Sequence, residues 1–318
     1  MNKVKIKSAG PMGIKMPFRS CIKSDFKRNW SLYLMMSPII IYYLIFKFGP
    51  MFGLSVAFMD YKPAKGFLDS NFVGLKHFKN FFNDYYFFRL LKNTISISVT
   101  SLLTFPAPII LALLINELKS KRFSRITQTV TYIPHFISMV VICGIIVKLT
   151  SSNGGITVIL NQLFGRPNET LLNKSSNFLP IYIISDIWQT IGWSSIIYLS
   201  ALAGVDQELY DAAKVDGAGR LKQVIYVTIP SIVPTIVIML ILKMGKIFDV
   251  GYEKIMLLYN PMIYEKADVI NTYVYRKGLI DAQFSYSAAV GLFNCVVCFS
   301  LVIITNKISK RVSGNGLW

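Results

Sequence analysis

The stretch Leu209–Arg220 reads LYDAAKVDGAGR and decides how the rest of the chain is interpreted. The adjacent Ala212 and Ala213 favour a helix with a compact face on which another backbone can approach closely. Gly217 is well placed to end that helix, because glycine adopts the left-handed conformation without steric cost. A second helical stretch follows over residues 220–227. The pattern predicts a helix, a tight turn and a second helix.

This polar stretch lies between two of six long apolar runs. The runs cover about residues 30–48, 91–116, 127–147, 179–203, 231–250 and 285–306. A helix of about 20 apolar residues is long enough to cross the hydrocarbon of a bilayer. We therefore predict an all-α integral membrane protein with six transmembrane helices and one membrane domain over residues 30–306.

The composition supports this reading. The chain has 318 residues, of which 53% are hydrophobic and only 16% are charged, and its mean hydropathy is +0.49. A soluble domain carries about 25% charged residues. The net charge of +18 would indicate nucleic-acid binding in a soluble protein, but in a membrane protein it is typical of basic cytoplasmic ends beside anionic lipid. We expect membrane lipid, and no nucleic acid, as a partner.

The distribution of basic residues predicts the orientation. The two tails, 1–29 and 307–318, and the loops 117–126 and 204–223 hold 18 Lys and Arg in 71 positions. The segments on the opposite side, 59–90, 148–179 and 251–284, hold 12 in 98 positions. Basic segments stay in the cytoplasm. Both termini are therefore predicted to be cytoplasmic tails, with the loop at about 205–230 on the same side.

That loop resembles the EAA loop of binding-protein-dependent ABC importer permeases. The family's order is Glu-Ala-Ala, then Asp-Gly-Ala, then an aliphatic-x-aliphatic-Pro ending; here Asp211 stands at the Glu position, and Val227, Ile229 and Pro230 close the motif. In that family the loop is a coupling helix that sits in a groove of the ATPase subunit. The residues that the resemblance assigns to ATPase coupling are Tyr210, Asp211, Ala212, Ala213, Asp216, Gly217 and Ala218.

The resemblance covers nearly everything after residue 30. The stretches Phe46–Pro50, Phe58–Pro63 and Gly251–Ile255 are similar to carbohydrate-uptake permeases of the polysaccharide and lipo-oligosaccharide, maltose-permease-like branch. This implies a type I ABC importer permease in a bacterial cytoplasmic membrane. It also implies four kinds of partner: a second homologous permease, two ATPase subunits, an extracellular solute-binding protein and an oligosaccharide substrate.

The chain lacks the Gly-x4-Gly-Lys-Ser/Thr phosphate loop, so it has no such ATP site of its own. We expect a non-catalytic translocation subunit without cofactor or metal, with ATP and Mg held by the partner ATPase. Cys295 and Cys298 form a CxxC inside an apolar run, where two small packing residues are commoner than a metal site. Two roles stay open for His135, a packing role and a proton relay.

The fourth run carries polar residues that are costly inside a membrane. Asp186, Gln189 and Trp193 are spaced i, i+3 and i+7, which predicts one helical face. Carboxylate, amide and aromatic groups are those that bind sugars, so this face is a candidate substrate path. Polar packing between helices is the alternative.

Lys243 and Lys246 lie in the fifth run, and Asn294 in the sixth is expected to face the same cavity. Lysines exposed to lipid are costly, so the two should face water or an acidic partner such as Asp186. Three interpretations stay open: a structural ion pair, direct contact with an anionic sugar such as a uronate or a sialylated glycan, or a span that ends at Lys243.

Two other function classes fit parts of the sequence. An ion-gradient-driven secondary transporter would use the charges of the fourth and fifth runs for coupling, and it predicts an inverted repeat that the sequence does not display. A membrane-embedded enzyme acting on lipid-linked sugar would need a catalytic carboxylate or His cluster near a membrane face. Neither alternative requires the Asp211–Gly217 loop.

Overall fold

The computed structural model describes residues 25–67, 69–165, 169–314 and 316–317, and its chain divides into two compact units, Met1–Ser55 and Val56–Trp318. Within these described residues no β-strand is present, and one antiparallel bridge joins Met59 and Phe72. The all-α prediction therefore holds for the described part of the chain. Most of the predicted basic tail 1–29 lies outside the described residues.

The described part of the first unit consists mainly of one long apolar helix. It contains α2 (Trp30–Tyr43), the π-turn η1 (Leu44–Phe48), α3 (Gly49–Met51) and the start of the 3-10 turn η2 (Phe52–Phe58). None of the residues of α2, η1 and α3 is buried within the chain. A helix that is apolar on all sides needs an apolar surrounding, which fits a membrane span.

The second unit is built from helices that differ greatly in length. In chain order they are α4 (Lys76–Phe82), α5 (Phe87–Leu103), α6 (Pro106–Asn116), α7 (Lys121–Tyr132), η3 (Ile133–Phe136), α8 (Met139–Leu149), α9 (Gly155–Phe164), η4 (Leu171–Asn173), α10 (Ser175–Ala203), α11 (Gln207–Val215), α12 (Arg220–Gln223), η5 (Val224–Thr228), α13 (Ile229–Met244), α14 (Tyr252–Leu258), η6 (Pro261–Ile263), α15 (Tyr264–Ala267), α16 (Ile270–Tyr275), η7 (Arg276–Ile280) and α17 (Phe284–Ser313).

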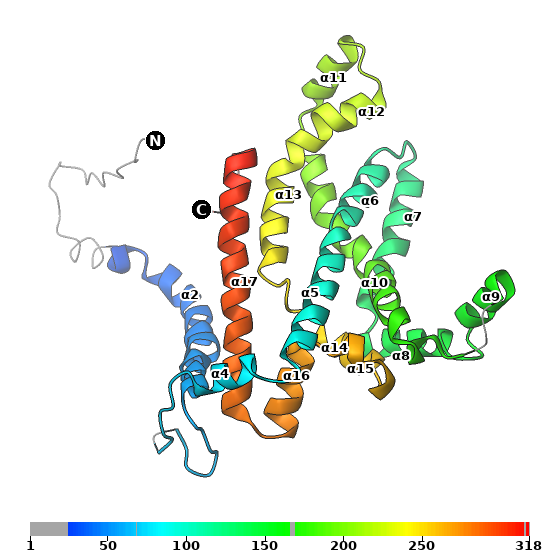
Figure 1. Cartoon of the computed structure of the whole chain (residues 1–318). Helices are drawn as coiled ribbons and strands as arrows, with labels where there is room; N and C mark the ends of the chain where they lie inside the picture. Colours follow the sequence, from blue (N-terminus) through cyan, green and yellow to red (C-terminus); the bar gives the residue numbers. More distant parts are fainter. Residues whose placement is uncertain (1–24, 68, 166–168, 315, 318) are drawn as a thin grey trace. The chain divides into compact units, whose positions relative to one another are not determined.

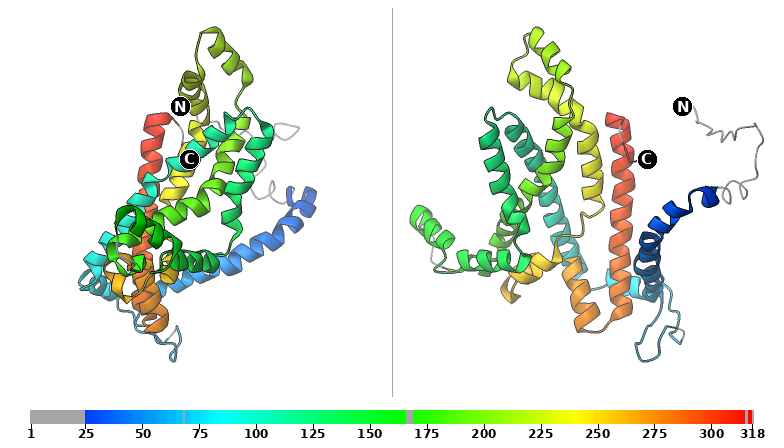
Figure 2. Two further views of the ribbon diagram at one scale, coloured as in Figure 1. Left: turned by 90° about the vertical axis from the view of Figure 1, so that its right-hand side faces the viewer. Right: turned by 180° about the vertical axis from the view of Figure 1, so that it is seen from behind.

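The second unit has two distinct ends. The hairpin of α11 and α12 lies at the same end as the α6–α7 connection and the C-terminal end of α17, while α4, α15 and α16 lie at the other end (Figures 1 and 2). The long helices α5–α6, α10, α13 and α17 run between these ends (Figure 2). The segments predicted to be cytoplasmic therefore lie together in this unit.

The number of spans is established only in part. Four helices are long and apolar enough to cross a membrane, Trp30–Phe58, Phe87–Asn116, Arg220–Met244 and Phe284–Ser313, and a bent pair makes up to five among the described residues. The predicted runs 30–48, 91–116 and 285–306 each lie within one of these helices. A multi-helix membrane protein is thus confirmed, whereas six crossings are not.

The predicted third span, 127–147, is strongly bent in the structure. Lys121–Phe136 and Met139–Leu149 meet at an angle of 97°. Pro134 is the second residue of the 3-10 turn η3, and the Ser138 side chain then caps α8 by accepting a hydrogen bond from the Val141 N–H at 3.4 Å. A proline followed by a new N-cap ends one helix and begins another.

Helix α10 corresponds to the predicted fourth span but is less apolar than the four candidates. It has 29 residues, enough at about 1.5 Å per residue to cross a bilayer. Its backbone packs closely against α7, because a Cβ atom added to Gly192 would clash with the backbone carbonyl of Thr131. Glycine at this position allows the two helices to approach.

The helix of the fifth span is displaced from its predicted range of 231–250. It runs without interruption from Arg220 through a π-turn to Met244, and Gly245 caps it. Lys246 therefore lies after the helix. The helix of the sixth span continues to Ser313, so part of the predicted C-terminal tail 307–318 is helical.

The segment 251–284, expected to be an outer connection, contains much of the buried core. Ile255, Ile263, Ala267 and Val269 have no exposed surface and pack with residues of α5, α8 and α10 in one apolar cluster. Burial of this many apolar side chains stabilises the segment between the longer helices.

Candidate functional site

The α11–α12 hairpin is held by local capping interactions. Asp206 begins α11 by accepting a hydrogen bond from the Glu208 N–H at 3.0 Å. At the other end Gly217 has φ +75°, its N–H donates to the Lys214 carbonyl at 3.0 Å, and the Ala218 N–H donates to the Ala213 carbonyl at 2.8 Å. This is a Schellman motif, and it confirms the predicted left-handed end of the helix.

One contact between side chains ties α11 to the residues just before α13: the Tyr210 hydroxyl lies 3.0 Å from the Thr228 hydroxyl. Within the hairpin, the Gln223 amide of α12 donates to the Ala218 carbonyl at 2.7 Å. The helix then continues through the π-turn into α13. The hairpin is therefore connected to α13 by a side-chain contact and by a continuous helix.

The outer surface of the hairpin is uncovered in the chain. Val215 is 88% exposed and Leu221 is 74% exposed, although both are apolar. Asp211 pairs with Lys214 at 2.8 Å on the exposed surface. Of the other residues predicted to couple to an ATPase, Ala212, Asp216 and Gly217 are exposed, and Tyr210, Ala213 and Ala218 are partly buried. Exposed apolar side chains beside charged ones are typical of a protein interface.

A cavity of about 360 Å³ lies between the α5–α6 helix, α10 and α13, and we call it the central cavity. Asp186, Lys243 and Lys246 all line it. The other residues that line it are Thr104, Phe105, Ala107, Pro108, Ile187, Thr190, Ile191, Ser194, Tyr198, Met239 and Leu242. Its polar groups are thus two ammonium groups, one carboxylate and several hydroxyls.

The charges of the central cavity do not pair with one another. Lys243 Nζ donates to the Ser101 carbonyl at 2.6 Å and lies 5.8 Å from the centre of the Phe105 ring. Lys246 is exposed, and its side chain forms no hydrogen bond or ion pair with the described residues. Asp186 instead forms an ion pair with Lys254 of α14, at 3.5 Å.

Lys254 is a buried charged residue near the central cavity that the sequence pattern did not indicate. Its side chain is 1% exposed and its Nζ lies 5.1 Å from the centre of the Tyr182 ring. Burial lowers the pKa of Lys254, while the charge of Asp186 acts in the opposite direction. The apolar residues that follow Lys254, from Ile255 to Leu258, were the available signal that the segment is buried.

Gln189 and Trp193 do not line the central cavity with Asp186. Viewed down the helix axis, at about 3.6 residues per turn, Gln189 and Trp193 are rotated from Asp186 by about 60° and 20° in one direction. Thr190 and Ser194, which line the cavity, are rotated by about 40° and 80° in the opposite direction. The Gln189 side chain is buried, and its Oε1 has no hydrogen-bond partner among the described residues. The Trp193 ring stacks on His135 with centroids 4.5 Å apart.

Asn294 also lies away from the central cavity. Its amide donates to the Asn271 side-chain oxygen at 3.1 Å and so joins α17 to α16. Asn271 in turn donates to the Phe248 carbonyl at 3.2 Å. In this structure Asn294 therefore has a packing contact.

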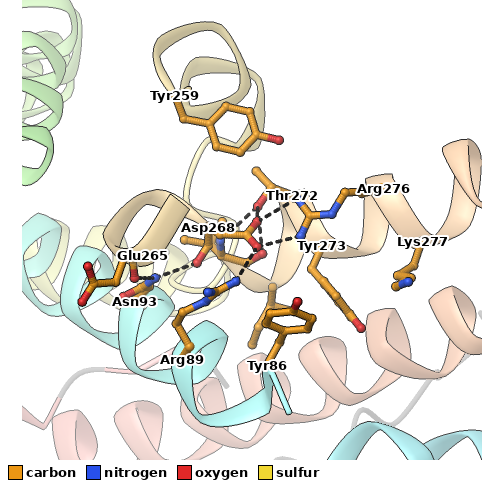
Figure 3. A network of polar contacts seen from close by, with 12 residues as sticks. Tyr86, Arg89, Asn93, Tyr259, Glu265, Asp268, Thr272, Tyr273, Arg276 and Lys277 are labelled. Carbon is orange, nitrogen blue, oxygen red and sulfur yellow. Dashed lines mark hydrogen bonds and ion pairs between the residues drawn. The ribbon is translucent and has the colours of Figure 1, made fainter. Parts of the chain in front are cut away.

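A network of ion pairs centred on Asp268 lies near the end opposite the hairpin (Figure 3). Asp268 has no exposed surface and binds Arg276 with two hydrogen bonds, at 2.7 and 3.3 Å. Thr272 donates to the same carboxylate at 2.8 Å, and Arg89 Nη2 lies 3.8 Å from it. Asn93 of α5 donates to the Asp268 carbonyl at 2.9 Å. The network fixes α15 and α16 against α5.

A second carboxylate holds the same end of the bundle. Asp84 accepts hydrogen bonds from the hydroxyls of Tyr273 and Tyr286 and, at 2.8 Å, from the Tyr86 N–H. Burial alone would raise the pKa of Asp84, but these hydrogen bonds and the charge of Lys277 outweigh it and lower the pKa.

Within the described part of the chain, no three His, Cys, Asp or Glu side chains are grouped as a metal site requires.

Comparison with known proteins places these features in a family. Residues 104–314 match the model of the family described as binding-protein-dependent transport system inner membrane component. The polygalacturonan/rhamnogalacturonan transport system permease protein YteP of Bacillus subtilis (strain 168) is 45% identical over 288 residues, covering 90% of each chain. Protein LplB of the same organism is 42% identical over 294 residues, covering 92% of each.

A solved structure agrees with the sequence relatives. One chain of a bacterial ABC transporter involved in the import of the acidic polysaccharide alginate matches with a TM-score of 0.84 and 42% identity, over 92% of this chain and 99% of that one. The same transporter has been crystallised in complex with an alginate pentasaccharide-bound periplasmic protein, and its chain matches equally well.

Proposed function

The chain belongs to the family of binding-protein-dependent transport system inner membrane components, and we propose that it imports an anionic, uronate-containing oligosaccharide. As a member, it is a permease subunit of an ABC importer. The observation that carries the substrate proposal is the charge of the central cavity: Lys243 and Lys246 face it, while its one acid, Asp186, is paired with Lys254.

The physical argument is one of uncompensated charge. A cavity that presents two ammonium groups, with its carboxylate already paired, favours an anion over a neutral sugar. The relatives support the same class of substrate. One is named a polygalacturonan/rhamnogalacturonan transport permease, and a similar solved structure belongs to an importer of the acidic polysaccharide alginate. Thr190 and Ser194 would supply hydroxyls to the sugar.

The assembly that we propose has four kinds of partner. They are a second homologous permease, two ATPase subunits that bind ATP and Mg, an extracellular solute-binding protein and the oligosaccharide. The exposed apolar residues of the hairpin support docking to an ATPase, and the complex of the alginate importer with its periplasmic protein supports a solute-binding protein.

The proposed topology has six spans in a bacterial cytoplasmic membrane and cytoplasmic termini. In this topology α10 is one span and the bent pair of α7 and α8 is another, in addition to the four long apolar helices. The hairpin then faces the cytoplasm together with the basic loop 117–126.

In the proposed mechanism, closure of the ATPase pair pushes α11. The Tyr210–Thr228 contact and the continuous helix from Arg220 to Met244 carry that displacement into α13, which holds Lys243. Lys243 thereby moves relative to α10 and its Asp186, and the central cavity opens alternately to the two sides of the membrane.

The experiment is a comparison of charged and neutral substrates. The importer, reconstituted in proteoliposomes with its ATPase and solute-binding protein, is tested with oligogalacturonate and with a neutral galactose oligomer of the same length. Lys246→Met is expected to lower uptake of the charged oligomer about tenfold or more, because one full charge is lost from the cavity. Uptake of the neutral oligomer should change less than twofold.

The matched control is Lys307→Met, which removes an exposed lysine of α17 that does not line the central cavity. It should leave both substrates unaffected. Equal losses of charged and neutral uptake in Lys246→Met would contradict a role of this lysine in recognising charge.

A further inference from the structure

A second basic pocket lies where α5 and α10 begin, and we call it the entry pocket. Its volume is about 660 Å³, within the range of about 300–1,000 Å³ common for small-molecule sites. The residues that line it are Phe88, Arg89, Lys92, Asn93, Ser96, Ile97, Ser175, Ser176, Leu179, Pro180, Glu265 and Lys266. None of them lines the central cavity.

The charge of the entry pocket is positive. Arg89, Lys92 and Lys266 line it against a single acid, Glu265. Lys92 and Lys266 are exposed and have no ion pair within the described residues. The pocket thus presents ammonium groups that are free to meet an anion.

Arg89 is held in place by its neighbours, but not all of its hydrogen-bond donors have a partner among the described residues. Its guanidinium lies 4.6 Å from the centre of the Tyr86 ring and 3.8 Å from Asp268, whose carboxylate is already bound twice by Arg276 (Figure 3). Its Nε is buried without a hydrogen-bond partner among the described residues. A planar guanidinium with spare donors is suited to a carboxylate.

The other lining groups suit a sugar. Phe88 has a ring that is 77% exposed, and Ser96, Ser175 and Ser176 carry hydroxyl groups. An aromatic face, hydroxyls and a guanidinium are the groups that a uronate residue would contact through its ring face, its hydroxyls and its carboxylate.

The entry pocket is aligned with the central cavity. Both are lined by the α5–α6 helix and by α10, and from Pro180 in the first to Asp186 in the second is about 9 Å along α10. The residues that line the entry pocket belong mainly to the first turns of α5 and α10 and to α15, and α15 lies at the end of the bundle opposite the hairpin (Figure 1).

We infer that the entry pocket is a separate uronate-binding site, which holds a carboxylate of the incoming glycan before the glycan reaches the central cavity. This rests on the proposed function. Arg89, Lys92 and Lys266 bind the carboxylate, and Phe88 stacks on the sugar ring.

The test measures occupancy of the pocket without transport. Ser176→Cys places a thiol at the lining, and its maleimide labelling rate in the reconstituted importer is read by mass spectrometry of its own peptide. Oligogalacturonate at millimolar concentration should slow labelling of the new thiol at least threefold. The neutral galactose oligomer should not slow it.

The site variant is Lys92→Met with Lys266→Met, which should abolish the protection. Lys65→Met, an exposed lysine outside the pocket, is the matched control and should retain it. Both pocket lysines are exposed, so the double variant is expected to fold normally.

Several results would overturn the inference. No protection, equal protection by both oligomers, or protection that persists in the double variant would each do so. Protection by vesicles rich in phosphatidylglycerol without any glycan would assign the pocket to lipid headgroups instead. Because labelling requires no uptake, a failure here leaves the result for Lys246→Met in the central cavity unaffected, and the reverse also holds.

Discussion

The α11–α12 hairpin and the segment 252–280 at the other end of the bundle are built in opposite ways. The hairpin buries no residue of α11 and is held by its own caps. The segment α14–α16 buries Lys254, Asp268 and several apolar side chains completely or almost completely and is held by residues far away in the chain. One region is uncovered and ready for a partner, whereas the other is part of the core.

This difference teaches where each kind of variant should act. Changes in the hairpin should alter communication with an ATPase while the chain stays folded. Changes at Asp268 should lower the stability of the chain itself. The variants below test this difference between the two regions.

Asp268→Ala should have the largest effect on stability. It leaves the partly buried Arg276 without its carboxylate, and loss of one partner of a buried pair costs about 3 kcal/mol. Thermal unfolding of the purified importer, followed by loss of the monodisperse peak in size-exclusion chromatography, measures this. We expect a marked drop in midpoint.

The control for that variant is Asp281→Ala, which breaks the more exposed Lys277–Asp281 pair of 2.9 Å. It should cost less than about 1 kcal/mol. The double variant Asp268→Ala, Arg276→Met should cost less than the sum of the two single variants. Additive losses would show that the two side chains are not coupled.

Gly217→Pro should abolish uptake while the protein still inserts and unfolds at the normal temperature. Proline fixes φ near −65°, whereas this position has φ +75°. Gly217→Ala should be milder, since the strain of a left-handed alanine is about 1 kcal/mol. Uptake and ATP hydrolysis stimulated by the loaded binding protein are the measurements.

Gly219→Ala is the matched control in the same turn. Its φ is −66° and no atom lies within 4 Å of an added Cβ, so activity should be unchanged. If Gly219→Ala were as harmful as Gly217→Ala, the left-handed turn would not be the cause.

Tyr210→Phe should weaken the link between α11 and α13. The loss of one hydrogen bond, about 1 kcal/mol, corresponds to a fall of up to about fivefold in stimulated ATP hydrolysis. Thr228→Val should have a similar effect, and the double variant should be no worse than either. Tyr226→Phe, whose side chain is 75% exposed, should be silent. A harmful Tyr226→Phe would argue against a specific Tyr210–Thr228 link.

The smallest expected effect is a pH dependence at Asp84. Because its pKa is lowered in the folded chain, ionised Asp84 stabilises the fold above the ordinary aspartate pKa of about 3.9, and this contribution is lost as the pH falls further. The stability difference between wild type and Asp84→Asn should be constant from about pH 5 to 8 and should narrow below about pH 4. A stability difference between the two proteins that does not change with pH would contradict a lowered pKa of Asp84.

What the sequence could predict follows the same division. The hairpin was predictable, because Gly217 and the capping residues act within a few positions of one another. The pattern also indicates a shared cavity for Asp186, Lys243 and Lys246, because charged side chains inside apolar runs are costly in lipid and must face water or a partner.

Tertiary features could not be obtained in this way. The ion pair of Asp186 with Lys254 joins residues 68 positions apart, and the side of α10 that faces the cavity depends on which helices pack around it. The bend near Pro134 was readable in principle, since a proline and a capping serine follow one another closely. The apolar pattern alone predicted one continuous run and did not show the bend.

The measurement that tests the account most directly is the energy source of uptake. Proteoliposomes containing this chain, its second permease and the ATPase are supplied with the solute-binding protein and oligogalacturonate, with an ionophore present to remove ion gradients. The account predicts uptake that requires ATP and the binding protein, continues with the ionophore and is lost in Gly217→Pro. Uptake that proceeds without ATP and stops with the ionophore would contradict it and would identify a secondary transporter.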